Sequence, residues 1–118
     1  MFRRIEHVQL AIPPGEETRA AAFWCGVLGF VPIDKPPLLA RRGGAWFAHG
    51  DVQVHVGIEA DFVPAAKAHP AFLVDDVDAI AAQLVAAGAE VRWSEEVPGS
   101  RRLHSFDPFG NRFEVIAG

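Results

Sequence analysis

Three histidines and one glutamate stand at related positions in the two halves of the sequence. His7 and His69 are 62 residues apart, and His55 and Glu114 are 59 residues apart. Imidazole nitrogens and carboxylate oxygens can bind divalent metal ions, and the same groups carry protons in acid–base catalysis. The spacing indicates a candidate site assembled from two copies of one structural unit.

The strands that carry these residues are expected to turn them away from the core. In residues 52–58, valines and an isoleucine occupy one face and polar residues the other, because side chains alternate along a strand. Phe113 and Val115 are expected to pack inward under a helix by the same alternation. The ligand-type side chains on the opposite faces are His7, His55, His69 and Glu114.

The first half is expected to contain a strand, a helix and further strands. Alternating residues predict a strand at 5–12, and acidic residues after Pro13-Pro14-Gly15 predict the start of a helix that Gly29 ends. Prolines and a glycine pair then break the chain into short pieces. Strands are predicted at 45–48 and 52–58.

The second half repeats this order after a connector at 59–68. The strand expected at 69–74 leads to a helix that Asp75-Asp76 caps and Gly88 closes. Further strands are predicted at 89–93, 102–106 and 112–116, the last two joined by a hairpin connection at 107–111.

The register of the repeat is constant on either side of a single insertion. The offset of 62 between the opening histidines becomes 59 at Gly29 and Gly88, and the longer loop at 13–17 in the first half explains the three-residue change. We expect an α+β fold of two βαβββ modules, about 5–59 and 68–118, within a single domain at 1–118.

The amino-acid composition argues against some classes of partner and some cellular locations. The formal charge is −4, which offers no basic excess for nucleic acid. Cys25 is the only cysteine, so no intrachain disulfide is possible. No apolar run approaches the roughly 20 residues of a spanning helix, and no secretory signal is evident. We expect a soluble, cytoplasmic protein without a membrane partner.

The order and spacing of four motifs resemble the vicinal oxygen chelate superfamily, over nearly the whole chain. This superfamily includes glyoxalase I, extradiol dioxygenases, methylmalonyl-CoA epimerase, fosfomycin-resistance enzymes and bleomycin-binding proteins. Each motif alone is weak, and together they make the resemblance specific. The motifs are Glu6-His7-Val8-Gln9-Leu10, Phe23-Trp24 with Val27-Leu28-Gly29-Phe30, His69-Pro70-Ala71-Phe72-Leu73-Val74-Asp75-Asp76-Val77, and Asp107-Pro108-Phe109-Gly110-Asn111-Arg112-Phe113-Glu114.

The resemblance implies an incomplete barrel with helices outside and a cleft inside. It also implies metal ligands on the first and last strands of the modules, at His7, His55, His69 and Glu114. This donor set suits zinc, nickel, iron or manganese, and two of the histidines with Glu114 match the facial triad of non-haem iron enzymes. The sequence leaves the choice among these metals open.

The leading hypothesis is a metal-dependent enzyme that acts on a small oxygen-rich molecule, as a lyase, isomerase, transferase or ring-cleaving dioxygenase. Glyoxalase I has a glutamate where His55 stands here, which argues against methylglyoxal as the substrate. Glu114 is the expected catalytic proton carrier. The candidate substrate contacts are Trp46, Arg102, His104 and Phe106.

Several of these residues also fit purely structural roles. Trp46 is equally consistent with a position in the core and one in a pocket wall, and His104 is also consistent with a surface position. The arginine pairs at 41–42 and 101–102 are consistent with solvent-exposed loops. The alternative function is a metal-free protein that binds a small molecule or antibiotic, as bleomycin-binding members do. A third possibility is a catalytically lapsed dimer module. A homodimer is the expected assembly in each case.

Overall fold

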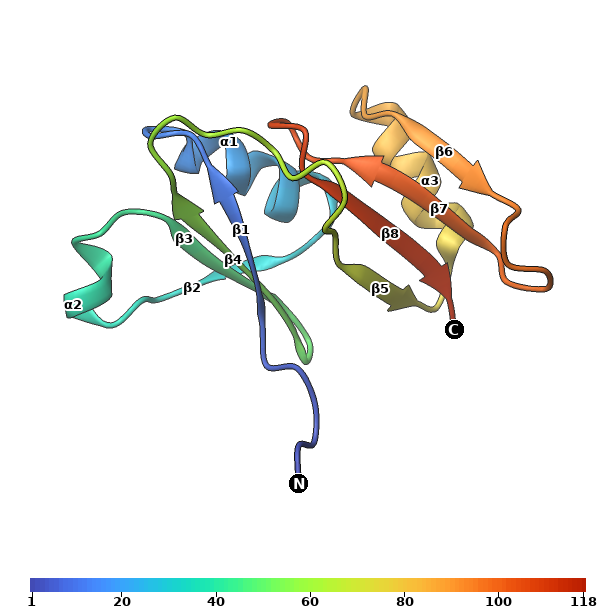
Figure 1. The fold of residues 1–118 in the computed structure, drawn as a ribbon, viewed down its shortest axis with the longest axis horizontal. Coiled ribbons are helices and arrows are strands. Elements are labelled where there is room, and N and C mark those ends of the chain that lie inside the picture. Colours follow the sequence, from blue (N-terminus) through green and yellow to red (C-terminus); the bar gives the residue numbers. More distant parts are fainter. The chain divides into compact units, whose positions relative to one another are not determined.

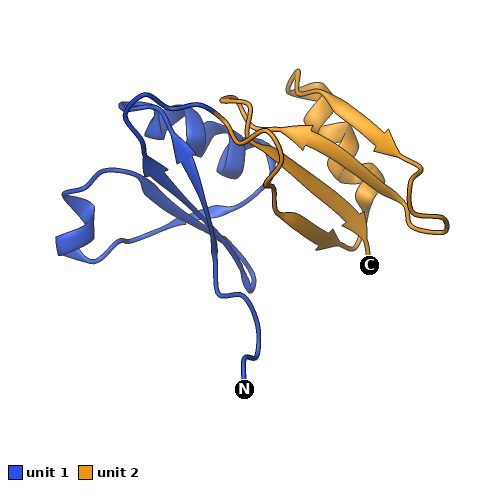
Figure 2. Cartoon of the chain, in the orientation of Figure 1, with its two compact units in different colours: residues 1–63 blue, residues 64–118 orange.

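The computed structural model describes all 118 residues, which form two compact units. Unit 1 is Met1–Val63 and unit 2 is Pro64–Gly118 (Figure 2). The boundary falls inside the connector expected at 59–68. None of the helices has the length and apolarity that crossing a bilayer requires.

Unit 1 is a four-stranded mixed sheet with helical segments (Figure 1). The sheet order is β1-β4-β3-β2, with β1 parallel to β4 and the other neighbours antiparallel. Its elements are β1 (Val8–Ile12), α1 (Glu17–Ala21), η1 (Ala22–Val27), β2 (Val31–Ile33), α2 (Pro37–Ala40), β3 (Ala45–His49) and β4 (Val52–Ile58).

Unit 2 has the same topology, with sheet order β5-β8-β7-β6 and only β5 and β8 parallel. Helix α3 lies along one face of this sheet (Figure 1). The α+β class and the repeated βαβββ order are confirmed. The elements of unit 2 are β5 (Ala71–Val74), α3 (Val77–Ala86), β6 (Val91–Ser94), β7 (Arg102–Phe106) and β8 (Arg112–Ala117).

The helix predicted in each unit forms between its expected start and its expected glycine stop, but the helix of unit 1 is not α-helical throughout. Asp76 accepts a hydrogen bond from the Ala79 amide at 3.0 Å, and Gly88 follows α3 with φ of 80°. The first helix does not run as one α-helix, because α1 continues into the π-helical segment η1 before Gly29, whose φ is 79°.

Two elements of unit 1 were missed because prolines were interpreted as breakers. Pro32 lies in β2, which is an edge strand, where a residue without an amide donor is tolerated. Pro37 is the first residue of α2, a position that needs no amide donor. The predicted strands at 5–12 and 69–74 begin too early, since β1 and β5 start at Val8 and Ala71.

Each unit buries one face of its sheet. Val54 and Val56 on β4 and Phe113 and Val115 on β8 are nearly inaccessible to solvent, as the alternation predicted. Each large apolar side chain buried this way stabilises the fold by roughly 1.5–3 kcal/mol. The prediction was wrong at the ends of β4, where Val52 and Ile58 are exposed. The other large buried side chains include Ile12, Trp24, Phe47, Leu84 and Leu103.

A buried aspartate shapes the hairpin connection between β7 and β8. The Oδ1 atom of Asp107 accepts hydrogen bonds from the amides of Phe109 at 2.9 Å and Asn111 at 2.8 Å. Its Oδ2 atom accepts from Nδ2 of Asn111 at 2.8 Å, and Gly110 takes a φ of 90°. The carboxylate therefore sets the register in which β7 and β8 pair.

We expect Asp107→Ala to lower the free energy of unfolding by about 1–3 kcal/mol, because it leaves buried N–H groups without their acceptor. Urea denaturation followed by circular dichroism measures the change. Asp51→Ala, in the exposed turn between β3 and β4, is the control and should shift stability by less than about 0.5 kcal/mol. Equal effects from the two substitutions would contradict this role for Asp107.

Candidate functional site

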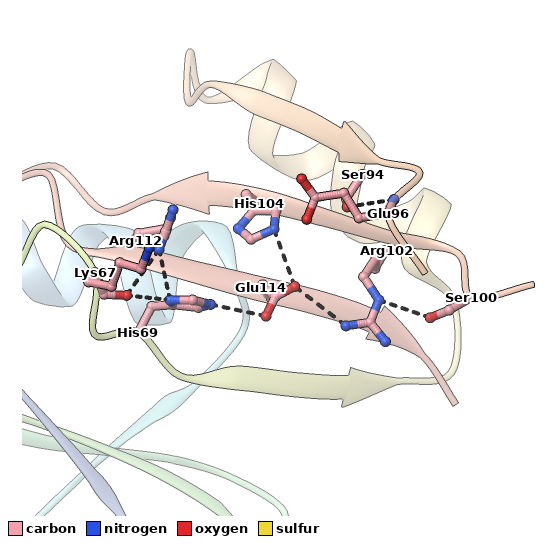
Figure 3. A network of polar contacts seen from close by, with 9 residues as sticks. All are labelled: Lys67, His69, Ser94, Glu96, Ser100, Arg102, His104, Arg112 and Glu114. Atoms are coloured by element: carbon pink, nitrogen blue, oxygen red, sulfur yellow. Dashed lines mark hydrogen bonds and ion pairs between the residues drawn. The ribbon is translucent and has the colours of Figure 1, made fainter. Parts of the chain in front are cut away.

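Glu114 lies at the centre of a polar cluster in unit 2 (Figure 3). Its Oε2 atom is 3.0 Å from Nε2 of His69, and its Oε1 atom is 3.2 Å from Nε2 of His104. The Oε1 atom is also 3.5 Å from Nη1 of Arg102. The Glu114 side chain is only 14% exposed, so a negative charge largely withdrawn from water is surrounded by three basic groups.

Strand register places these side chains together. His104 on β7 is the direct cross-strand partner of Glu114 on β8, and Arg102 precedes His104 by two residues on the same face. In the parallel pair, Ala71 on β5 is opposite Glu114, and His69 lies two residues before Ala71. The cluster is therefore a consequence of pairing across three adjacent strands.

The surroundings of Glu114 favour its ionised form. Partial burial alone would raise the pKa of the carboxyl group, but the hydrogen bond with His69 and the charges of His104, His69 and Arg102 lower the pKa below its ordinary value. An ionised carboxylate is the form that binds a metal ion.

His69 lies in a network that accommodates either neutral tautomer of its ring. Its Nδ1 atom is 2.7 Å from the carbonyl oxygen of Lys67 and 3.1 Å from Nη2 of Arg112, which donates to the same carbonyl at 3.0 Å. With its proton on Nε2, the ring donates to Glu114 and accepts from Arg112. With its proton on Nδ1, the ring donates to Lys67 and presents the Nε2 lone pair that a metal ion requires.

The donor set of unit 2 fits a divalent metal ion. One ligand atom each from His69, His104 and Glu114 lie within 4.8 Å of one another. Two imidazoles and a carboxylate suit zinc, iron, nickel or manganese. The Nδ1 atom of His104 is buried without a hydrogen-bond partner.

Unit 1 presents a stack of three rings at the equivalent positions. His55 on β4 is the cross-strand partner of Trp46 on β3, and their rings stack with centroids 4.3 Å apart and an interplanar angle of 10°. The ring of His7 covers the other face of His55 at 4.0 Å and 11°. The side chain of His55 also bonds Oε1 of Gln53 at 3.0 Å.

The surroundings of His55 favour its neutral form. Burial lowers the pKa of its imidazole most, and the charge of His7 lowers it further. Glu6 opposes this shift, and Lys35 adds the smallest lowering effect. The residue is 3% exposed although it lies on the face of β4 opposite the valine core, because the neighbouring rings cover it.

The four predicted ligands form two pairs, one in each unit. His7 and His55 are together in unit 1, and His69 and Glu114 are together in unit 2. The prediction for His104 included only a substrate contact and missed its place beside the two ligands of unit 2. The signal was available, because pairing outward from the connection at 107–111 brings 104 opposite 114.

The other candidate contacts lie near these groups. Phe106 shares the face of β7 with His104 and Arg102, and its ring lies 5.0 Å from the guanidinium carbon of Arg92. The Nε atom of Arg102 donates to Oγ of Ser100 at 2.9 Å, which fixes the arginine beside the cluster. Trp46 is half-buried and lines a cavity within unit 1.

Comparisons with known proteins agree over almost the full length. A family model described as a glyoxalase-like domain matches residues 10–116, and no curated protein matches the chain. The structure of a putative glyoxalase family protein from Bacillus anthracis is 41% identical with a TM-score of 0.95, over 100% of this chain and 97% of that one.

Two more distant structures share the fold. FosX, a genomically encoded fosfomycin resistance protein from Listeria monocytogenes, is 20% identical with a TM-score of 0.77, over 100% of this chain and 95% of that one. TnmS3, an antibiotic binding protein from Streptomyces sp. CB03234, is 24% identical with a TM-score of 0.72, over 98% of each chain.

The lowered pKa of Glu114 predicts how its contribution to stability depends on pH. Because the folded pKa lies below the unfolded one, the stabilisation is complete above the unfolded pKa and is lost as the pH falls through the folded pKa. Glu114→Gln in metal-free protein should therefore lower the free energy of unfolding at neutral pH and approach the wild-type value in acid.

Urea denaturation of both proteins over a series of pH values measures this difference. Glu59→Gln, at an exposed position, is the control and should leave the free energy of unfolding nearly unchanged at every pH. A deficit in Glu114→Gln that is as large in acid as at neutral pH would contradict an electrostatic origin.

Proposed function

Because the chain belongs to the glyoxalase-like domain family of the vicinal oxygen chelate superfamily, we propose that it is a divalent-metal-dependent enzyme acting on a small oxygen-rich molecule. The observation that carries the proposal is the convergence of His69, His104 and Glu114 in unit 2. A fosfomycin resistance protein and an antibiotic binding protein with this fold support a small-molecule substrate.

His69 and Glu114 are the proposed core of the metal site. His104 is the third donor within the same unit, and the repeat also predicts His7 and His55 as ligands. A bound divalent ion would polarise oxygen atoms of the substrate and stabilise negative charge that develops on them. Zinc, nickel, iron and manganese all suit this set.

The residues around the metal donors have separate proposed roles. Lys67 and Arg112 hold the ring of His69 in one orientation. Glu114 is the proposed proton carrier, and Arg102 beside it offers a positive charge to an anionic group of the substrate. Trp46 and Phe106 are proposed substrate contacts, with His104 in that role if it does not bind the metal. The homodimer and the cytoplasmic location stay predictions.

Elemental analysis of protein purified without an affinity tag should find about one divalent ion per chain. Glu114→Gln and His69→Ala should weaken metal binding by more than about tenfold in titrations of metal-free protein, because each removes a donor. The remaining ligands are identified by single alanine substitutions of His104, His7 and His55. A substitution that weakens metal binding marks its histidine as a ligand.

His49→Ala is the matched control, since this histidine lies at the exposed end of β3. Its metal affinity should equal that of the wild type. Circular dichroism confirms that each variant is folded. Stoichiometric metal retained by both Glu114→Gln and His69→Ala would overturn the assignment of the site.

The second candidate function is metal-free binding of an antibiotic or another small molecule. The observation that favours it is the ring stack of Trp46, His55 and His7, which requires no metal ion to form. The antibiotic binding protein TnmS3 has the same fold. Aromatic surfaces that are already ordered bind planar ligands at a low cost in conformational entropy.

Metal-free bleomycin added to EDTA-treated protein tests this second function. Quenching of tryptophan fluorescence that is lost in Trp46→Phe would support it. Trp24 is buried in the core and Trp93 lies in unit 2, so Trp24→Phe and Trp93→Phe should retain the quenching. Binding that appears only after metal is restored would favour the enzyme instead.

A further inference from the structure

A cavity of about 240 Å³ lies in unit 1, apart from the polar cluster of unit 2. One wall is the segment that carries α2, between β2 and β3, and the other is the sheet itself. Trp46 belongs to both the cavity wall and the ring stack, so the cavity adjoins His55. The lining side chains used below are Gln9, Lys35, Leu39, Arg42, Trp46 and Ile58.

The only charged residues that line the cavity are basic. Lys35 and Arg42 stand on the α2 segment, and neither forms an ion pair with a carboxylate. The ammonium of Lys35 donates one hydrogen bond to the carbonyl oxygen of Gly43, which leaves further N–H groups for a ligand. The chain as a whole carries a charge of −4, so this local pair of cations runs against the overall balance.

One carboxylate, that of Glu17 on α1, approaches this region from outside the cavity. Oε2 of Glu17 accepts a hydrogen bond from the Gly44 amide at 3.1 Å, and Glu17 does not line the cavity. Lys35 and Arg42 are therefore the charged groups that an anion inside the cavity would meet.

The rest of the wall is apolar apart from one amide. Leu39, Ile58 and the indole of Trp46 supply the apolar surface. The carboxamide of Gln9 lies across Gly57, where a Cβ atom would come within 2.6 Å of its Nε2 atom. Glycine at position 57 thus makes room for the Gln9 side chain, which forms no hydrogen bond with the rest of the protein.

We propose that this cavity binds a small organic anion with a carboxylate on a flat apolar body. The carboxylate meets Lys35 and Arg42, the apolar body lies against Leu39 and Trp46, and Gln9 supplies a polar contact. The cavity volume is below the roughly 300 Å³ at the lower end of pockets for drug-sized ligands, so the occupant is small. The inference rests on the proposed small-molecule function and names its ligand class.

Calorimetry of EDTA-treated protein with benzoate and with benzyl alcohol tests the proposal. The two probes have similar shape and differ in charge, so benzoate should bind about tenfold more tightly or better. Lys35→Met and Arg42→Gln should each weaken benzoate binding by about tenfold and leave benzyl alcohol unaffected. Trp46→Leu should weaken both probes, because it removes the shared apolar surface.

Two control variants keep the result interpretable. Arg41→Gln removes an exposed charge next to Arg42 that does not line the cavity, and it should bind benzoate as the wild type does. Lys35→Arg keeps the charge and should restore most of the affinity lost in Lys35→Met. Circular dichroism checks the fold of each variant.

Equal affinity for benzoate and benzyl alcohol would overturn the proposal, as would unchanged benzoate binding in Arg42→Gln. Competition by inorganic phosphate as strong as by benzoate would overturn the organic class of the ligand. Metal titration of Lys35→Met, which should match the wild type, separates the two proposals. If the wild type and all variants fail to bind metal, benzoate binding can still be observed. If none of them binds benzoate, metal binding can still be observed.

Discussion

The alternation of side chains along β4 and β8 is the constraint on which the rest of the structure depends. Helix α3 packs against the sheet of unit 2, and Phe113 and Val115 are buried on β8. Because side chains alternate along a strand, the side chain of Glu114 between them must point to the opposite face of the sheet. A slip of one residue in the register would bury this carboxylate and expose two large apolar side chains, so the core fixes the direction of the site residue.

The repeated unit produces equivalent sets of three side chains with different chemistry. In each unit a residue of the last strand faces its cross-strand partner, and a histidine precedes the first strand: His55, Trp46 and His7 in one, Glu114, His104 and His69 in the other. Two imidazoles beside a carboxylate attract a cation. Two imidazoles beside an indole form a stack whose central ring, His55, is buried and favours its neutral form.

Much of this arrangement was predictable, because the signals were local. The cap at Asp76, the helix stops at Gly29 and Gly88 and the faces of β4 and β8 followed from residue type and period. The start of β1 was not predictable, because Glu6 and His7 continue the alternation without a partner strand. The role of His104 depends on pairing across strands, which appears only once the turn at Asp107 is fixed.

The equivalent sets differ at two positions of the repeat: unit 1 has His55 where unit 2 has Glu114, and Trp46 where unit 2 has His104. In unit 2, burial would raise the pKa of Glu114, but His69, His104 and Arg102 lower it and favour the ionised form. In unit 1, burial lowers the pKa of His55 and favours the neutral form. The neutral form of His55 adds no charge to the cavity beside it, where Lys35 and Arg42 are the only charged lining residues. The same fold therefore gives unit 2 a carboxylate that attracts a cation, and gives unit 1 a cavity whose charged lining residues can meet an anion.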